Sequence, residues 1–531
     1  MRSSVICSFS VVTMFVCAVL LGGCGSGNKE GQTFPTAQAT VIDNANCTNA
    51  CHAASKDLSG VLVDEWNASV HKKVGVECQG CHGPGSLHWG LGPIPFPNPD
   101  AALICSNCHS RNALGAPHYN SISSAAYPAQ YVSSQNVGKC TRCHEPHDNT
   151  LLPQNTDWAG SAHAAFTDRP FTEDDFKTLN TCNRCHTTTG FVNFLQSGNL
   201  NQPAWGSPSD NTKELIDCNA CHVDYSWQRR DGITSLNPVG VKFPYPVTFG
   251  NTTTNILYVL PPVGESNLCC SCHSFRKSGR SAILTKVTNG TSFSSVRQHY
   301  LGAAGTLYRL AGYEFLPHTP NYDNFPFFSH ADIGILATAS NGDDISSLQF
   351  SDGSLRGPCV GCHLWGDPPS HTLDPAVISP PGSINGTVTA IPANPLVCSL
   401  CHAGKFAMTP ASLTAEKQLY RDRLAALAGT LQTKLGIFYN PDIDPYFFTD
   451  STSLVPFTLW QTAATTLGGG ATANQVIGAA FNLQLCFKEP GGYVHNDKYT
   501  GDLIYDSLDL LDNGRVDGSY VNSVIFPAGR P

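Results

Sequence analysis

Residues 78–109 read CQGCHGPGSLHWGLGPIPFPNPDAALICSNCH, and this stretch contains two copies of the pattern Cys-x-x-Cys-His. The pattern occurs eight times in the 531-residue chain, and one further copy has the wider spacing Cys-x-x-x-Cys-His. CxxCH is the attachment signature of c-type haem: two thiols form thioethers with the vinyl groups and the histidine binds the iron. Composition alone would give about 0.04 copies in a chain this rich in cysteine and histidine.

The sequence therefore predicts nine c-type haems, one of them at the wider motif. Zinc sites pair one CxxC with another and need no histidine after each, and disulfides across two-residue gaps would be strained and labile. The predicted thioether cysteines are Cys47, Cys51, Cys78, Cys81, Cys105, Cys108, Cys140, Cys143, Cys182, Cys185, Cys218, Cys221, Cys269, Cys272, Cys359, Cys362, Cys398 and Cys401. The predicted proximal ligands are His52, His82, His109, His144, His186, His222, His273, His363 and His402.

Ten histidines lie outside the motifs, one more than nine haems need as sixth ligands. They are His71, His88, His118, His147, His163, His299, His318, His330, His371 and His495. Methionine, the other common sixth ligand, is represented outside the leader only by Met408. Two histidines on one iron give low potentials and leave no position for a substrate, so this count indicates electron transfer. The count does not identify the spare histidine or the pairing.

Local context supports several of these ligands. Residues 66–71 and 158–163 share the pattern Trp-x-x-Ser-x-His, which indicates an internal repeat. His88 follows a Gly-Pro-Gly turn that can carry it toward a neighbouring haem. His147 lies three residues after His144, through Glu145 and a proline.

The spacing of the motifs indicates the fold class. The first six begin 27 to 42 residues apart. Segments this short cannot build apolar cores of their own, so the haem array must be the core. The expected fold is mainly α with much irregular coil, short helices, few strands and a helical C-terminal tail. The predicted regions are a lipoprotein signal peptide (1–23), a flexible tether (24–46), a six-haem region (47–230), a three-haem region with longer insertions (231–402) and a haem-free helical tail (403–531).

Several elements can be predicted individually. A helix near 293–310 would carry His299, and residues 232–262 could contribute a strand or two. Three tail helices are expected: one beginning at Thr409-Pro410, one over 472–489 and one over 497–512. His495, at the mouth of the last helix, is either a returning haem ligand or part of a plain stabilising cap. Cys270 and Cys486 are predicted to be buried apolar thiols, with a disulfide between them as the alternative.

The N-terminus has the features of an export leader. An apolar stretch ends in Leu21-Gly22-Gly23-Cys24, the form of a bacterial lipobox, so Cys24 is predicted to be acylated. A secretory signal with a chance cysteine and a membrane-spanning anchor are the alternatives.

The net charge of −9 argues against nucleic acid as a partner. The predicted location is the outer membrane, with a lipid anchor.

Three segments resemble outer-membrane multihaem cytochrome lipoproteins of metal-reducing bacteria, of the porin–cytochrome conduit type. They are GCGSGNKEG at the leader, residues 78–109, and EPGGYVHNDKYTGDLIYDSLDLLDNG from Glu489. The resemblance implies a protein exposed at the cell surface, which takes electrons from redox partner cytochromes through a porin and passes them to an acceptor such as ferric oxide. The chain departs from that family in its smaller number of haems and in its CxxxCH motif.

The leading prediction is an electron carrier rather than an enzyme. The first alternative is a reductase of nitrite, hydroxylamine or sulfur oxyanions with one open-site haem. Nitrite reductases of that type often use CxxCK, which does not occur here. The second alternative is a cytochrome filament subunit, and the predicted lipid anchor at Cys24 argues against it.

Overall fold

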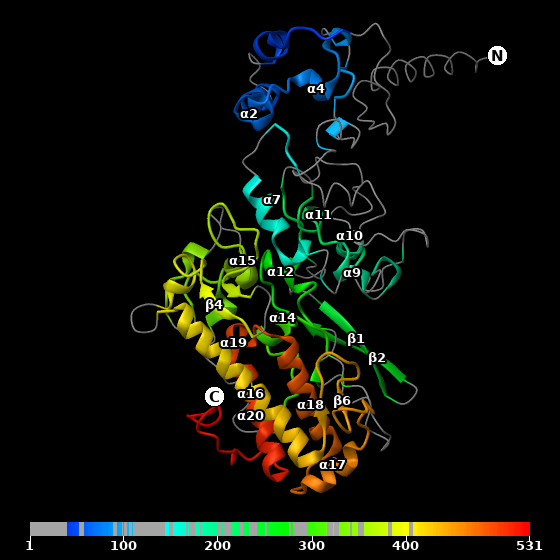
Figure 1. Ribbon diagram of the computed structural model, residues 1–531, viewed down its shortest axis with the longest axis vertical. Coiled ribbons are helices and arrows are strands. Elements are labelled where there is room, and N and C mark those ends of the chain that lie inside the picture. Colours follow the sequence, from blue (N-terminus) through cyan, green and yellow to red (C-terminus); the bar gives the residue numbers. More distant parts are fainter. Residues whose placement is uncertain are drawn as a thin grey trace, which may run out of the picture. The chain divides into compact units, whose positions relative to one another are not determined.

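A computed structural model of the chain divides it into two compact units (Figure 1). Unit 1 comprises residues 1–119 and 136–151, and unit 2 comprises residues 120–135 and 152–531. The residues that the structure describes are 40–52, 58–88, 93–97, 99, 104–105, 109, 144–147, 152–165, 168, 176–180, 182–198, 204, 214–223, 227–232, 242–249, 252–275, 278–279, 296, 298–315, 322, 329–339, 342–348, 355–380, 385–402 and 407–531. The predicted six-haem region 47–230 thus has parts in both units.

The described part of unit 1 contains five short helical segments, of which the first and the fourth carry haem motifs. They are η1 (Asn46–Cys51), α2 (Leu58–Ala68), α3 (Val70–Lys73), α4 (Cys78–His82) and η2 (Gly85–Leu87). Gly83 ends α4 with a φ of +81°, a backbone conformation that favours glycine. A β-carbon there would come 2.9 Å from the Phe96 ring, so the turn after this motif depends on Gly83.

In unit 2, the haem-motif region is also built from short helices joined by coil. They are α7 (Leu152–Ala159), η4 (Ala162–Ala164), η5 (Phe176–Thr178), α9 (Asn183–His186), α10 (Thr188–Ser197), α11 (Cys218–Cys221), α12 (Ser266–Cys270), α14 (Ala303–Leu307), η6 (Ser329–Asp332), η7 (Ser346–Leu348), α15 (Gly357–His363) and η8 (Cys398–Leu400). The described strands form three antiparallel pairs: β1 (Lys242–Phe249) with β2 (Thr252–Val259), β3 (Val377–Ser379) with β4 (Thr387–Ala390), and β5 (Phe438–Tyr439) with β6 (Phe447–Phe448).

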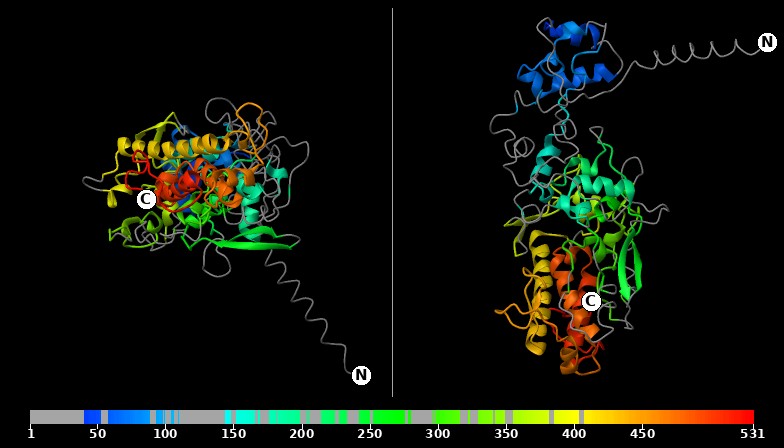
Figure 2. Two further views of the ribbon diagram at one scale, coloured as in Figure 1. Left: turned by 90° about the horizontal axis from the view of Figure 1, so that it is seen from below. Right: turned by 90° about the vertical axis from the view of Figure 1, so that its right-hand side faces the viewer.

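The C-terminal tail contains the long helices. They are α16 (Pro410–Leu435), α17 (Trp460–Leu467), α18 (Ala473–Lys488) and α20 (Asp497–Asn513), with the short α19 (Gly492–His495) before the last. Thr409 and Ser412 form a capping box at the start of α16, and Thr472 and Gln475 form another at α18. Helices α16, α18 and α20 pack side by side, as both views show (Figure 2).

The largest apolar core among the described residues lies where these tail helices meet. It includes Leu427, Leu431, Val476, Leu503 and Leu508, which are fully buried. Beside the motifs, the described side chains form only small apolar clusters of four or five buried residues. This contrast is what a protein would show if its haems filled the core of the motif region.

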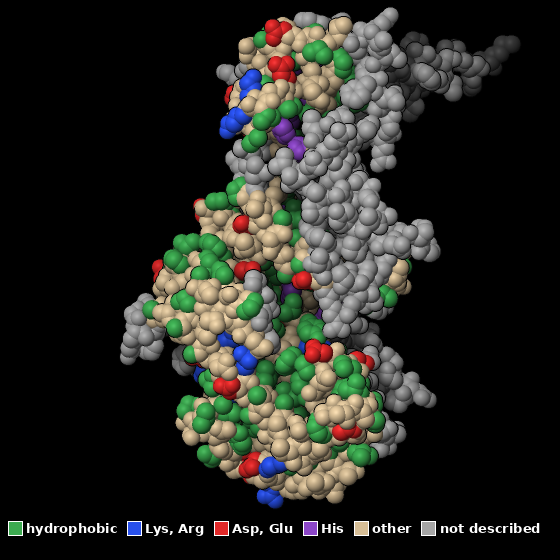
Figure 3. All heavy atoms as spheres, viewed as in Figure 1, with side chains coloured by type: hydrophobic (Ala, Val, Ile, Leu, Met, Phe, Trp, Pro, Cys, Tyr) green, Lys and Arg blue, Asp and Glu red, His purple; other side chains and the backbone are tan. Residues whose placement is uncertain are grey.

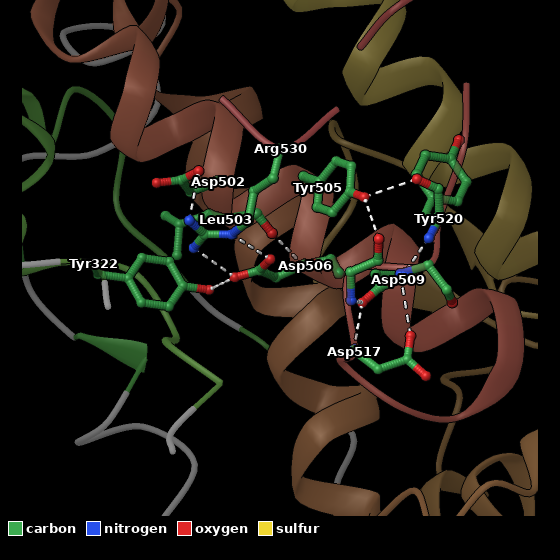
Figure 4. A network of polar contacts seen from close by, with 12 residues as sticks. Tyr322, Asp502, Leu503, Tyr505, Asp506, Asp509, Asp517, Tyr520 and Arg530 are labelled. Atoms are coloured by element: carbon green, nitrogen blue, oxygen red, sulfur yellow. Dashed lines mark hydrogen bonds and ion pairs between the residues drawn. The ribbon is translucent and has the colours of Figure 1, made fainter. Parts of the chain in front are cut away.

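A polar network ties the end of the chain to α20 (Figure 4). The Arg530 guanidinium donates two hydrogen bonds, of 2.8 and 2.9 Å, to the carboxylate of Asp506, which also accepts from the Tyr322 hydroxyl. Asp509 accepts from the backbone N–H groups of Asp517, Gly518 and Tyr520. The last residues therefore close over the helix.

The predicted fold class is confirmed: the described residues are mainly helical with coil and short strands. The predicted strands occur as β1 and β2, and the three tail helices as α16, α18 and α20. The predicted helix over 293–310 is wrong. Among the described residues of that range, 296 and 298–310, only α14 is helical. His299 lies before it, because Leu301 takes a φ of +55° and the helix begins after Gly302.

Two further expectations concern cysteines and membranes. Cys270 and Cys486 are free and buried, and they belong to separate apolar clusters. The leader with Cys24 lies outside the described residues. Where the structure is described, no helix is both long and apolar enough to span a bilayer.

The visible face of the described residues mixes uncharged side chains with scattered charges of both signs (Figure 3).

Candidate haem-binding sites

Each regular motif for which the backbone is described forms a single helical turn. In that turn the histidine N–H donates to the carbonyl of the first cysteine, as His222 does to Cys218 at 2.9 Å and His402 to Cys398 at 2.7 Å. The wider motif keeps this bond by forming a π-helical turn, η1, in which the His52 N–H donates to Cys47 at 3.0 Å. A π-turn absorbs one extra residue, so the longer spacing still places the histidine as in the other motifs.

Among the described residues, eight motif histidines each lie opposite one histidine from outside the motifs, with the two rings stacked, tilted or edge-on. The distances between ring centres all fall between 5.8 and 6.4 Å. In unit 1 the pairs are His52–His88, His109–His71 and His82–His147. In unit 2 the pairs are His273–His163, His186–His299, His222–His371, His402–His330 and His363–His495.

This spacing fits one iron between two imidazoles. A histidine–metal bond is about 2 Å long and the donor nitrogen lies about 1 Å from its ring centre, so two trans ligands have ring centres about 6 Å apart. Direct contact between the rings would bring them closer. The recess beside His186 and His299 is also lined by Cys182 and Cys185, the cysteines of the same motif. The residues therefore fit a thioether-bound haem with two axial histidines.

Hydrogen bonds fix which nitrogen faces the partner ring. Nδ1 of seven of these histidines lies 2.7 to 3.0 Å from a backbone carbonyl oxygen, which can only accept. Those Nδ1 atoms must carry the proton, so Nε2 keeps the lone pair that binds a metal. The donors and acceptors are His71 to Pro146, His82 to Phe96, His222 to Trp227, His299 to Tyr300, His330 to Val494, His363 to Leu373 and His371 to Pro369.

Two histidines differ, because their Nδ1 atoms face carboxylates. His147 lies 3.0 Å from Glu145 Oε1, and His495 lies 2.8 Å from Glu489 Oε1. Reasoning from the sequence did not single out either glutamate as a site residue. The only sequence feature that could have indicated them is a glutamate two or six residues before a candidate ligand. Such glutamates are too common to predict a contact with the histidine.

Burial also favours the neutral imidazole that a metal requires. It lowers the pKa of His163 and of His222 to about 4 each, and it lowers the pKa of His330. His495 departs from this trend. Burial lowers its pKa too, but the hydrogen bond and the charge of Glu489 outweigh burial and leave the pKa raised.

The Trp-x-x-Ser-x-His repeat has the same local structure in both places. The indole N–H of Trp66 donates to Val76 at 3.0 Å, and that of Trp158 donates to Ile216 at 3.1 Å. Each acceptor stands two residues before the first cysteine of a motif. The repeat histidine then faces the following motif: His71 faces His109 and His163 faces His273. Each copy of the repeat thus contacts two successive motifs, one through its tryptophan and the next through its histidine.

The motifs of unit 2 are contiguous. Cys185 Sγ lies 3.9 Å from the Ser271 carbonyl, so the motifs at 182–186 and 269–273 touch. Shared apolar clusters join the motif at 269–273 to those at 218–222 and 359–363, and another joins 359–363 to 398–402. Neighbouring attachment sites therefore form an unbroken series of contacts.

The remaining predicted site residues are less fully placed. His144 is described, but Cys108, Cys140, Cys143, His118 and His318 lie outside the described residues. The other thioether cysteines stand on the motif turns. The eight pairs listed above do not include the motif histidine His144. Of the ten candidate distal ligands, they do not include His118 and His318.

The motifs and their paired histidines fit several c-type haems, and comparison with known proteins agrees. The chain is homologous to C-type polyheme cytochromes OmcB and OmcC of Geobacter sulfurreducens, and this homology implies several c-type haems. It is 26% identical to each, over 95% of this chain and 94% of the relative, and OmcB from a second strain gives the same values. No protein-family profile and no solved structure matches the chain.

The relatives carry segments that this chain lacks. The alignment with OmcB runs over 732 positions, whereas this chain has only 531 residues, so at least 201 positions face a gap here. The alignment therefore spans nearly the whole of both chains, with long gaps in this one.

Proposed function

We propose that this protein is a nine-haem electron carrier in which every haem has two axial histidines. The observation that carries the proposal is the set of eight histidine pairs, each joining one motif to one ligand candidate from another part of the chain. Two imidazoles on each iron leave no position for a substrate, so such a site passes electrons and does not convert bound molecules.

The chain's own residues have three tasks in this proposal. The motif cysteines bind the haems covalently, and the histidine pairs hold the irons. The Nδ1 acceptors orient the imidazoles, and burial favours their neutral form. Packed apolar side chains such as Leu268, Val360 and Leu348, all largely buried, keep water away. The bound haems would supply the one-electron chemistry.

The ninth haem is proposed at the CxxxCH motif. Its support is the π-turn of η1, which preserves the bond from His52 to Cys47, together with the 6.4 Å spacing between His52 and His88. Mass spectrometry of the proteolytic peptide containing Cys47 and Cys51 tests this site. A peptide carrying the mass of one haem is the expected result, and an unmodified peptide would reduce the count to eight.

The proposed location is the outer membrane, with the protein anchored through acylated Cys24 and exposed at the cell surface. The proposed partners are redox cytochromes, an outer-membrane porin and an acceptor such as ferric oxide. Support comes from the lipobox and from the sequence resemblance described above. The intact mass of the protein tests the lipid anchor, and proteolysis of whole cells tests the exposure at the cell surface. The Cys24→Ala variant is the control, and it is expected to be released from the membrane fraction.

The decisive experiment is a spectroscopic census of the purified ferric and ferrous protein. Haem stoichiometry, spin state and a carbon monoxide titration are measured together. Nine low-spin haems that are inert to carbon monoxide are expected. A high-spin haem that binds carbon monoxide in the wild type would overturn the proposal in favour of a reductase with an open iron.

A further inference from the structure

Two distal histidines differ from four other distal histidines in what their Nδ1 atoms face. His495 donates to Glu489 and His147 donates to Glu145, whereas Nδ1 faces a carbonyl oxygen in His71, His299, His330 and His371. Glu489 is only 1% exposed, so its carboxylate acts on His495 with little screening by water. Its second oxygen, Oε2, has no hydrogen-bond partner among the described residues.

The backbone holds Glu489 and His495 in this arrangement. Helix α18 ends at Lys488, and the turn through Gly491 brings His495 back over Glu489. A β-carbon at residue 491 would come 2.8 Å from His495 Cε1 and 3.2 Å from Glu489 Oε1, so only glycine leaves the pair undisturbed. The contact is therefore built into the turn rather than made by two mobile surface side chains.

The same arrangement occurs once in each unit. In unit 1, Glu145 accepts from His147, and the carbonyl just before that histidine, on Pro146, accepts from His71 at 2.8 Å. In unit 2, Glu489 accepts from His495, and the carbonyl just before it, on Val494, accepts from His330 at 2.7 Å. One short segment thus supplies a carboxylate to one site and a carbonyl to a second site.

We propose that Glu145 and Glu489 are tuning residues, which make the His82/His147 and His363/His495 haems lower in potential than the haems whose distal ligand is His71, His299, His330 or His371. A carboxylate draws the Nδ1 proton toward itself and makes the imidazole a stronger donor. A stronger donor stabilises the more positive ferric state. The neighbouring sites, His71/His109 and His330/His402, face neutral carbonyls and lie higher. This inference rests on the proposed bis-histidine ligation.

The test is a redox titration of the full holoprotein carrying Glu489→Gln, followed by absorbance and by electron paramagnetic resonance. Glutamine keeps an oxygen for the Nδ1 proton, so His495 should stay bound and every haem low-spin. The potential of one haem should rise by about 59 mV or more, a tenfold change in its reduction equilibrium. Glu145→Gln should do the same for a different haem. Glu416→Gln, which removes an exposed carboxylate from α16, is the matched control and should change nothing.

The outcomes separate the tuning inference from the proposed function. A low-spin Glu489→Gln protein with potentials like those of the Glu416→Gln control would overturn the inference. His495→Ala is titrated with carbon monoxide in parallel. If that variant stayed low-spin throughout, the ligand pairing itself would be wrong, and the tuning inference would fall with it.

Discussion

The carbonyl oxygen of Val494 accepts a hydrogen bond of 2.7 Å from Nδ1 of His330, and the next residue along the chain, His495, faces His363. One turn of the haem-free tail therefore takes part in two candidate haem sites. The tail contacts the last motifs through ligand and acceptor atoms as well as through packing. Its helices thus belong to the functional unit.

Replacing His495 with alanine is expected to open one iron. The His363 haem would lose its sixth ligand, become high-spin in the ferric state and bind carbon monoxide when reduced. A carbon monoxide titration of the holoprotein measures this directly, and one haem equivalent should respond. His330→Ala should open a different single haem. A response by two haems in His495→Ala would show that the 489–495 turn had collapsed rather than lost one ligand.

One of His118 and His318 is expected to be the ligand that faces His144, and the other to be the spare histidine. Each is replaced by alanine, and the spin state of the holoprotein is recorded. One variant should gain a single carbon monoxide-binding haem, and the other should resemble the wild type. Two affected variants would indicate that a described pair is incorrect, and two silent variants would indicate an open or differently ligated haem at His144.

Deletion of Ala50 is expected to leave the haem of the wider motif in place. The deletion turns Cys47–His52 into an ordinary CxxCH, and the His52 N–H can then reach the first cysteine through an α-turn instead of the π-turn. Haem stoichiometry by mass should remain that of the wild type. The double variant Cys47→Ala, Cys51→Ala should lose one haem. If the double variant kept the full count, no haem would be attached at this motif.

Gly491→Ala is expected to displace His495 from its site. Its β-carbon would come within 2.8 Å of the His495 ring and 3.2 Å of Glu489, so one of the two must move. A fraction of one haem should become high-spin, which absorbance in the ferric state measures. Gly429→Ala in α16 is the control, because a β-carbon there meets nothing within 4 Å. That change should stabilise the helix by about 0.5–1 kcal/mol.

The Arg530 network predicts a pH dependence of tail stability. Burial raises the pKa of Asp502 to about 8 from its ordinary value of 3.8, although Arg530 lies 3.0 Å away. Between these two values the folded tail holds a proton that the unfolded chain releases. Stability should therefore fall as the pH rises through this window.

Guanidinium denaturation at pH 5 and pH 8, followed by far-ultraviolet circular dichroism, measures this effect. The midpoint should drop at pH 8 in the wild type and change much less in Asp502→Asn, which has no proton to lose. Asp422→Asn, on the exposed side of α16, should behave as the wild type. An equal drop in Asp502→Asn would assign the pH dependence to other groups.

The attachment motifs alone indicate c-type haems, and the sequence also places the three tail helices. CxxCH combines thiols and an imidazole at a spacing that serves one chemistry, so the motifs needed no tertiary information. The predicted start at Thr409-Pro410 matches α16, and the predicted ranges 472–489 and 497–512 match α18 and α20 to within one residue, because the signals that start and end a helix act over one turn.

The pairing between distal histidines and motifs could not be predicted from the sequence and is seen in the folded chain. The paired residues lie at least 36 positions apart, as His52 and His88 do, and up to 149 apart, as His222 and His371 do. No local rule spans such distances. The roles of Glu489 and of the Val494 carbonyl could not be predicted from the sequence either. A carboxylate acts strongly on a histidine ligand only when folding removes both from water and holds them 2.8 Å apart, as it does for Glu489 and His495.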